Sequence, residues 1–183
     1  MANVDRPFGL RAAEHLDGSP YNGATRRVYI PATETDSIYL GSPVKSVGEA
    51  NDEGIPQVEL ADPGDALLGV VISFEPDRDN LSLQYSEGGK ARYAKVVTAP
   101  DVIFEVQADD SLPLANVGDL ADLTAESGSN VSGISTVELN VATAGTGTQV
   151  RVLSFVERED NDPGEDNAVV RVLIVDHEMK ATS

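Results

Sequence analysis

Two stretches of sequence decide the fold: TQVRVLSFVE, residues 148–157, and AVVRVLIVDH, residues 168–177. A polar loop, residues 158–167, separates them, which is typical of two neighbouring strands. Apolar side chains fall on both faces of each stretch; in the first, Val152 lies on one face and Leu153 on the other. Burial on both faces predicts a central pair of strands in a barrel, or strands at a subunit interface.

The rest of the chain also favours strands and turns. Valine and isoleucine together number 29, against 17 for leucine and methionine, and there are 16 glycines and 10 prolines. β-Branched residues suit sheets, while Gly and Pro interrupt strands. Further strands are predicted at residues 26–30, 37–40, 43–47, 57–60, 66–74, 91–98, 101–107 and 136–141.

Two of these strands are predicted to pair as a hairpin. Only an Ala-Pro dipeptide separates residues 91–98 from residues 101–107. In the second strand, apolar side chains alternate with Glu105 and Gln107, which is the pattern of a half-buried strand. We therefore expect Glu105 and Gln107 on its polar face.

Helix signals are few. Residues 116–125 have the best helical composition, but their Val-Gly-Asp start fits a turn into a strand equally well, and residues 12–16 could make one turn. The predicted fold is mainly β: a single compact antiparallel β-barrel or sandwich domain with an extended N-terminal arm and at most short helices. The arm comprises residues 1–27, where Pro and Gly disfavour both helix and strand, and an acidic β-rich body comprises residues 28–183.

Charge excludes one large class of partners. The formal net charge is −18, whereas nucleic-acid binding needs Lys and Arg to meet phosphates, so we expect no nucleic-acid partner. The charge is uneven: residues 1–27 carry four arginines and three carboxylates, or +1, and the remainder carries −19. No apolar run approaches the ~20 residues of a membrane span, so no membrane partner is expected. The N-terminal sequence lacks the apolar centre of a signal peptide, which predicts synthesis in a cytoplasm.

Catalytic and cofactor motifs are also missing. There is no Cys and no Gly-x-Ser-x-Gly, and the two histidines, His15 and His177, are 162 residues apart. Each histidine is interpreted as a structural residue; His177 lies between two carboxylates. Paired carboxylates occur in turns, but an acidic hydrolase acting on sugars would also use aromatic platforms, and there are only nine aromatic residues and no Trp. We expect no enzyme activity and no cofactor.

The loop at residues 158–167 is the one candidate for a metal. Asp160, Asp162, Glu165 and Asp166 supply hard oxygen ligands around Gly164, as calcium requires. The loop lacks the third Asp or Asn and the distant Glu of an EF-hand. A plain solvated hairpin loop is therefore preferred, and no metal is predicted.

The arm is the candidate interaction segment. It combines arginines with apolar and proline residues that can dock in an extended form. A frayed terminus is the alternative interpretation. The residues expected to contact a partner are Arg6, Pro7, Phe8, Leu10, Arg11, Tyr21, Arg26 and Arg27.

A family resemblance extends over most of the chain and is weakest between residues 109 and 147. It is carried by DRPFGLR (5–11), DGSPYNGAT (17–25), YIPA (29–32), LGSPV (40–44), GVV (69–71), FEPD (74–77), NLSLQY (80–85), PDVIFEVQ (100–107), VEREDN (156–161) and VLIVDH (172–177). In these stretches the chain resembles the head decoration proteins, or capsid cement proteins, of tailed bacteriophages.

The resemblance implies a non-enzymatic β-rich protein on the outer face of a phage capsid. It would bridge neighbouring major capsid subunits and stabilise the expanded head, and it would be made in the host cytoplasm. Its expected partners are the major capsid protein and itself, as a dimer or trimer at local symmetry axes. The alternatives are another virion β-domain, associated with a tail, baseplate or fibre, and a calcium-dependent binding module.

Overall fold

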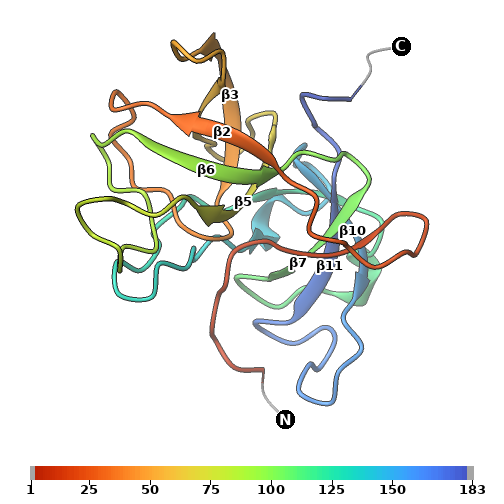
Figure 1. Cartoon of the computed structure of the whole chain (residues 1–183). Coiled ribbons are helices and arrows are strands. Elements are labelled where there is room, and N and C mark those ends of the chain that lie inside the picture. The colour runs from red at the N-terminus through yellow and green to blue at the C-terminus, as the bar shows by residue number, and fades with distance from the viewer. Residues whose placement is uncertain (1–2, 181–183) are drawn as a thin grey trace.

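The computed structural model describes residues 3–180, and nearly all of their regular structure is β. The strands form two sheets, one of them a closed barrel (Figure 1). Within the described range the only helices are single 3-10 turns at Leu114–Asn116 and Val141–Thr143, so no helix there could cross a membrane. The predicted fold class, mainly β with a barrel and at most short helices, is confirmed.

Five strands that follow one another in sequence close the barrel, in the order β2-β4-β3-β5-β6. Neighbouring strands are antiparallel except for a short parallel contact between β2 and β4. Its interior is filled by β-branched and small side chains, including Val44, Val58 and Val96, all fully buried. The strands are β2 (Arg26–Ile30), β3 (Pro43–Ala50), β4 (Pro56–Leu60), β5 (Gly69–Phe74) and β6 (Arg92–Val97).

Six strands form the second sheet, in the order β1-β7-β11-β10-β8-β9. The sheet curls back on itself, because Leu139 of its last strand bridges Ala108, just beyond β7. It encloses the larger core, around Phe104, Leu123 and Val150. The strands are β1 (Arg11–His15), β7 (Val102–Gln107), β8 (Leu120–Leu123), β9 (Leu139–Asn140), β10 (Val150–Phe155) and β11 (Val169–Ile174).

The two stretches that decide the fold pair as expected. β10 and β11 are antiparallel, with Val152 opposite Val172, and they lie in the middle of the second sheet. Their inner side chains are fully buried, whereas Leu153 and Leu173 on the outer face are only half-buried. The prediction that both faces are buried is therefore confirmed for the inner face and holds only in part for the outer face.

The predicted hairpin between residues 91–98 and 101–107 is wrong. β6 belongs to the barrel, where it pairs with β2 and β5, and β7 belongs to the other sheet, where it pairs with β1 and β11. The Ala-Pro dipeptide is thus a crossover between sheets. Alternation identifies the faces of a strand but not its partner, and each strand finds a longer matched register elsewhere.

The N-terminal arm is extended, but it is part of the body. Residues 11–15 pair antiparallel with β7 as strand β1, so the possible helical turn at residues 12–16 is wrong. Leu10 is 2% exposed and lies in the larger core. The predicted boundary between residues 27 and 28 falls inside β2. The arm covers one side of β7, which is why Glu105 and Gln107 are buried rather than solvated.

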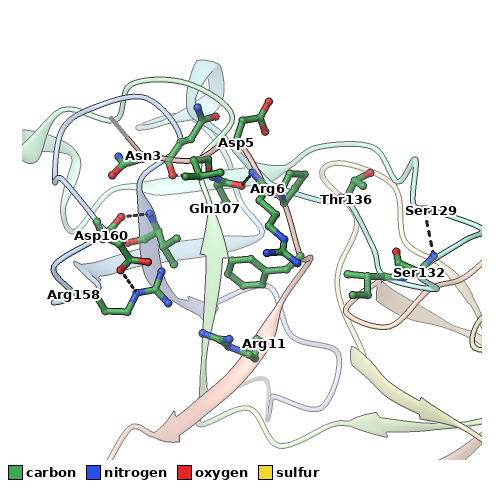
Figure 2. A pocket seen from close by; sticks show the side chains of 17 residues that line it. Asn3, Asp5, Arg6, Arg11, Gln107, Ser129, Ser132, Thr136, Arg158 and Asp160 are labelled. Carbon is green, nitrogen blue, oxygen red and sulfur yellow. Dashed lines mark hydrogen bonds and ion pairs between the residues drawn. The ribbon is translucent and has the colours of Figure 1, made fainter. Parts of the chain in front are cut away.

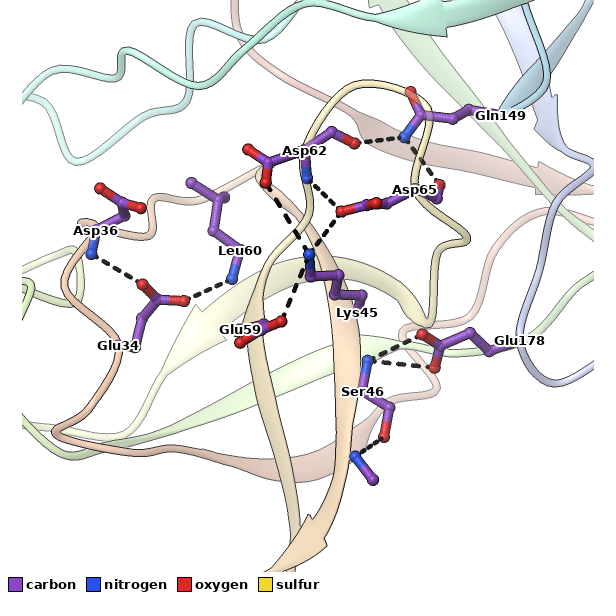
Figure 3. A network of polar contacts seen from close by, with 11 residues as sticks. Glu34, Asp36, Lys45, Ser46, Glu59, Leu60, Asp62, Asp65, Gln149 and Glu178 are labelled. Atoms are coloured by element: carbon purple, nitrogen blue, oxygen red, sulfur yellow. Dashed lines mark hydrogen bonds and ion pairs between the residues drawn. The ribbon is translucent and has the colours of Figure 1, made fainter.

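Polar contacts join the two sheets (Figure 3). The side-chain amide of Gln149, next to β10, donates to the carbonyl oxygens of Asp62 and Asp65, both at 3.0 Å, and its oxygen accepts from the N–H of Leu123. Lys45 of β3 holds the same turn through an ion pair with Asp65 at 2.6 Å. The barrel is therefore fixed to the sheet through the turn between β4 and β5.

Substitution of a glycine in β5 tests how closely the backbones of β5 and β6 pack in the barrel. A Cβ on Gly69 would lie 1.9 Å from the carbonyl oxygen of Val97, whereas a Cβ on Gly64 would meet nothing within 4 Å. We expect Gly69→Ala to lower the free energy of unfolding by about 3 kcal/mol or more, because backbone must move. Gly64→Ala, strained only by its positive φ, should cost about 1 kcal/mol. Urea unfolding of both variants checks this; equal losses would contradict it.

Candidate partner-binding site along the N-terminal arm

Carboxamide side chains hold the start of the arm against the body. Gln107, 2% exposed, accepts from the N–H of Arg6 at 3.0 Å and donates to the carbonyls of Val4 and Asn167 at 2.8 and 2.9 Å. Asn3 donates to the carbonyls of residues 162 and 166 and accepts from the N–H of residue 162. The backbone from residue 3 to residue 6 is therefore fixed without a sheet ladder.

A hollow of about 790 Å³ lies beside this fixed segment; we call it the basic hollow. One wall is the arm, and the other includes the hydroxyl-bearing residues Ser129, Ser132 and Thr136. Figure 2 shows the guanidinium groups of Arg6, Arg11 and Arg158 turned toward the same space, while the carboxylate of Asp5 points away from them. The basic hollow thus gathers three arginines against two carboxylates, Asp5 and Asp160, on a strongly anionic protein.

The three arginines differ in the ion pairs that they form within the protein. Arg6 is exposed and its guanidinium has no ion pair among the described residues. Arg158 pairs at 3.2 Å with Asp160, whose side chain is 77% exposed, so this contact is easily exchanged. Arg11 binds Glu105 and also lies 5.1 Å from the ring centre of Phe8. A guanidinium has five N–H donors, so each arginine keeps free donors for a ligand.

An apolar groove of about 420 Å³ adjoins the basic hollow. Phe8, Arg11 and Ile134 line both spaces, so the two are neighbours. Beyond these shared residues, the groove is lined mainly by Leu10, Ala12, Tyr21, Leu40 and Ile72. It runs along the arm at the junction of the two sheets.

The second wall of the basic hollow is held by one carboxylate. Glu126 accepts hydrogen bonds from the N–H groups of Gly128 and Thr136 at 2.8 and 3.2 Å. It also accepts from the hydroxyl of Ser135 at 2.6 Å and from the hydroxyl of Ser42. A loop rich in Ser and Gly is thereby fixed opposite the arm.

The structure brings together some of the predicted contact residues and separates others. Arg6, Pro7, Phe8 and Arg11 line the basic hollow, and Tyr21 lines the apolar groove, where its hydroxyl donates to the carbonyl of Ala24. Leu10 borders the groove but is buried in the protein's own core. Arg26 and Arg27 line a different hollow, with Leu68 and Met179 at one end of the barrel, and Arg27 is paired with Glu75.

Three residues of the site were not predicted from the sequence. Gln107 was expected on a polar face, and Ile134 lies in a segment with no strand pattern. Arg158 had a usable signal, because it is the only cation in the acidic loop at residues 158–167. A single arginine among carboxylates either pairs with those carboxylates or contacts a group outside the loop.

The histidines and the acidic loop have internal partners. His15 Nδ1 lies 3.0 Å from Asp101, and His177, 5% exposed, accepts from the N–H of Met179 at 3.0 Å. Burial lowers the pKa of His177. In the loop at residues 158–167, the carbonyls of residues 162 and 166 receive the amide of Asn3. Among residues 3–180 no group of three or more His, Asp or Glu side chains is placed to hold a metal.

The comparisons with known proteins add no further evidence. No protein-family model matches the chain, and no match is found among curated proteins or solved structures. Functional evidence therefore comes from the geometry of the site.

The surroundings of Glu138, near Asp5 of the arm, disfavour its charged form. Glu138 has its pKa raised to about 7, first because it is partly buried and then because Asp5 and Asp109 repel its charge. Protonation of Glu138 therefore favours the folded state, in which Asp5 of the arm lies nearby.

The clamp on the arm can be tested at Gln107. In Gln107→Leu the N–H of Arg6 and the carbonyls of Val4 and Asn167 lose their partner, so we expect a loss of about 2 kcal/mol or more in the free energy of unfolding. Hydrogen exchange at the Arg6 amide should accelerate more than global unfolding explains. Gln84→Leu, at an exposed glutamine, is the control. Unchanged exchange at Arg6 would contradict the clamp.

The free energy of unfolding should fall as the pH rises toward the pKa of Glu138 in the folded protein. Its folded pKa of about 7 exceeds the ordinary 4.5, so the folded state binds the proton more tightly and loses this advantage between pH 4.5 and 7. We expect Glu138→Gln to be more stable than the native protein at pH 8, by on the order of 1 kcal/mol after solvent screening, and equal to it below pH 4.5. Urea unfolding across this range, with Glu159→Gln at an exposed position as control, measures the effect; a constant difference would contradict it.

Proposed function

We propose that the protein is a structural virion component: a decoration, or cement, protein that binds the outer face of a phage capsid and stabilises the expanded head. The resemblance of residues 5–11, 17–25 and 100–107 to such proteins motivates the proposal. The observation that supports it is the basic hollow, because an arm held in place by Gln107 presents Arg6 and Arg11 to a space that Arg158 also lines. Such a fixed site loses little entropy when it binds a large rigid partner.

The charge of the body fits an outer surface. Packaged DNA repels a net charge of −18, whereas an exterior position leaves the carboxylates in solvent. Binding to the assembled shell alone would stabilise that shell by mass action. Many copies on one lattice let modest contacts sum. The partners in this proposal are the major capsid protein and further copies of the chain.

The structure changes how this proposal should be tested. Deleting the arm would remove strand β1 and Leu10, so the body would lose part of its core and its failure to bind would prove nothing. Point substitutions in the basic hollow are the appropriate variants. Arg78 is exposed, lies outside the hollow and provides a matched control.

The experiment mixes purified protein with expanded, undecorated heads of the phage that encodes it, sediments the heads and images them by cryo-EM. We expect density on the outer shell, and a loss of bound protein of about tenfold when Arg6→Ser and Arg158→Ser are combined. Arg78→Ser should bind normally. Absence of the native protein from the pellet, or density on a tail, would contradict the proposal.

A further inference from the structure

We propose that the basic hollow and the apolar groove form one continuous site for an extended peptide segment that carries aliphatic side chains next to carboxylates. The inference deepens the proposed function by naming the chemistry of the partner segment. It stands on the geometry of residues 6–11 and their neighbours, and it would hold for a segment from any protein.

Adjacency is the first observation. Phe8, Arg11 and Ile134 border both spaces, so an extended ligand that crosses these side chains would reach both. Phe8 is half-buried and Ile134 is 39% exposed, so both offer apolar area at the junction. Spaces of about 790 and 420 Å³ are in the range of ligand sites. A segment lying along the arm would meet both.

Charge selects the acidic half of the ligand. Arg6 has no ion pair among the described residues, and Arg158 is engaged only by the exposed Asp160. A guanidinium binds a carboxylate through two parallel N–H donors, which gives strength and direction. Carboxylates entering the basic hollow would therefore find free donors in a chain whose other surfaces carry the excess of negative charge.

The apolar groove favours the aliphatic part of the peptide. It also argues against ligands without apolar side chains, such as nucleic acid. Leu40 and Ile72 offer no polar group to a phosphate or a sugar, and the negative body repels nucleic acid. An aliphatic side chain placed there leaves water and gains roughly 1.5–3 kcal/mol if fully buried. The two halves together favour a mixed peptide over a purely acidic ligand.

The test measures the binding of a labelled, end-blocked peptide, Leu-Val-Leu-Gly-Asp-Glu-Asp, by fluorescence anisotropy. Its reversed sequence is tested too, because the site does not fix the direction of the segment. We expect saturable binding of at least one peptide. Its amide counterpart, with Asn and Gln in place of the acids, and a counterpart with Ser in place of the aliphatic residues should each bind about tenfold more weakly or worse.

Matched substitutions locate the binding. Arg6→Ser should weaken it about tenfold, whereas Arg78→Ser, at an exposed arginine outside the site, should not. Ile134→Ser should weaken it severalfold, whereas Val131→Ser, at a side chain 98% exposed, should not. Circular dichroism confirms that the variants fold. No binding of either acidic peptide, or equal effects within a matched pair, overturns the inference.

Three further outcomes separate this inference from the capsid proposal and from self-association. Peptide binding without attachment to heads would retain the site and reject the cement function. Attachment to heads that Arg6→Ser leaves intact, without peptide binding, would reject the site and retain the function. Self-association in analytical ultracentrifugation that Arg6→Ser abolishes, without peptide binding, would assign the site to a second copy and overturn the inference.

Discussion

The fold depends on pairing backbone groups that no neighbouring strand can reach. Four carboxamide side chains do this: Asn3, Gln107, Gln149 and Asn161, the last closing its own loop through Val156 and Val169. An amide both donates and accepts, so it can stand in for a piece of strand, and it carries no charge whose burial would be costly. These contacts tie arm to body, barrel to sheet, and loop to strand.

The acidic composition also has a structural use. Carboxylates accept the N–H groups of turns throughout the chain: Glu126 orders the loop opposite the arm, and Asp122 accepts from the N–H groups of Thr148 and Gln149 at 2.7 and 3.2 Å. Much of the negative charge therefore shapes loops as well as facing solvent. Against this background, an arginine without a carboxylate partner, such as Arg6, stands out as available for an external anion.

Periodicity predicted the β class, the β10–β11 pair and most strand positions, because alternation and β-branched residues report burial directly. It did not predict partners. β7 pairs with a strand about ninety residues earlier, a register that local pattern does not encode. The structure places Arg6, Phe8 and Arg11 of the predicted arm beside the basic hollow, whereas Leu10 belongs to the core. Arg158 and Ile134 join the site only through the fold, since nothing near them in sequence links them to the arm.

The sequence order of the strands has a consequence for synthesis. The barrel is contiguous from Arg26 to Val97, so it can close once that stretch has left the ribosome. The other sheet joins β1 to β7 and β7 to β11, so it waits for nearly the whole chain. Until then Leu10 and the apolar side of β7 have no cover. During that interval the nascent chain carries a closed barrel with exposed apolar segments on both sides of it in sequence. Protection by a chaperone would matter most at that stage.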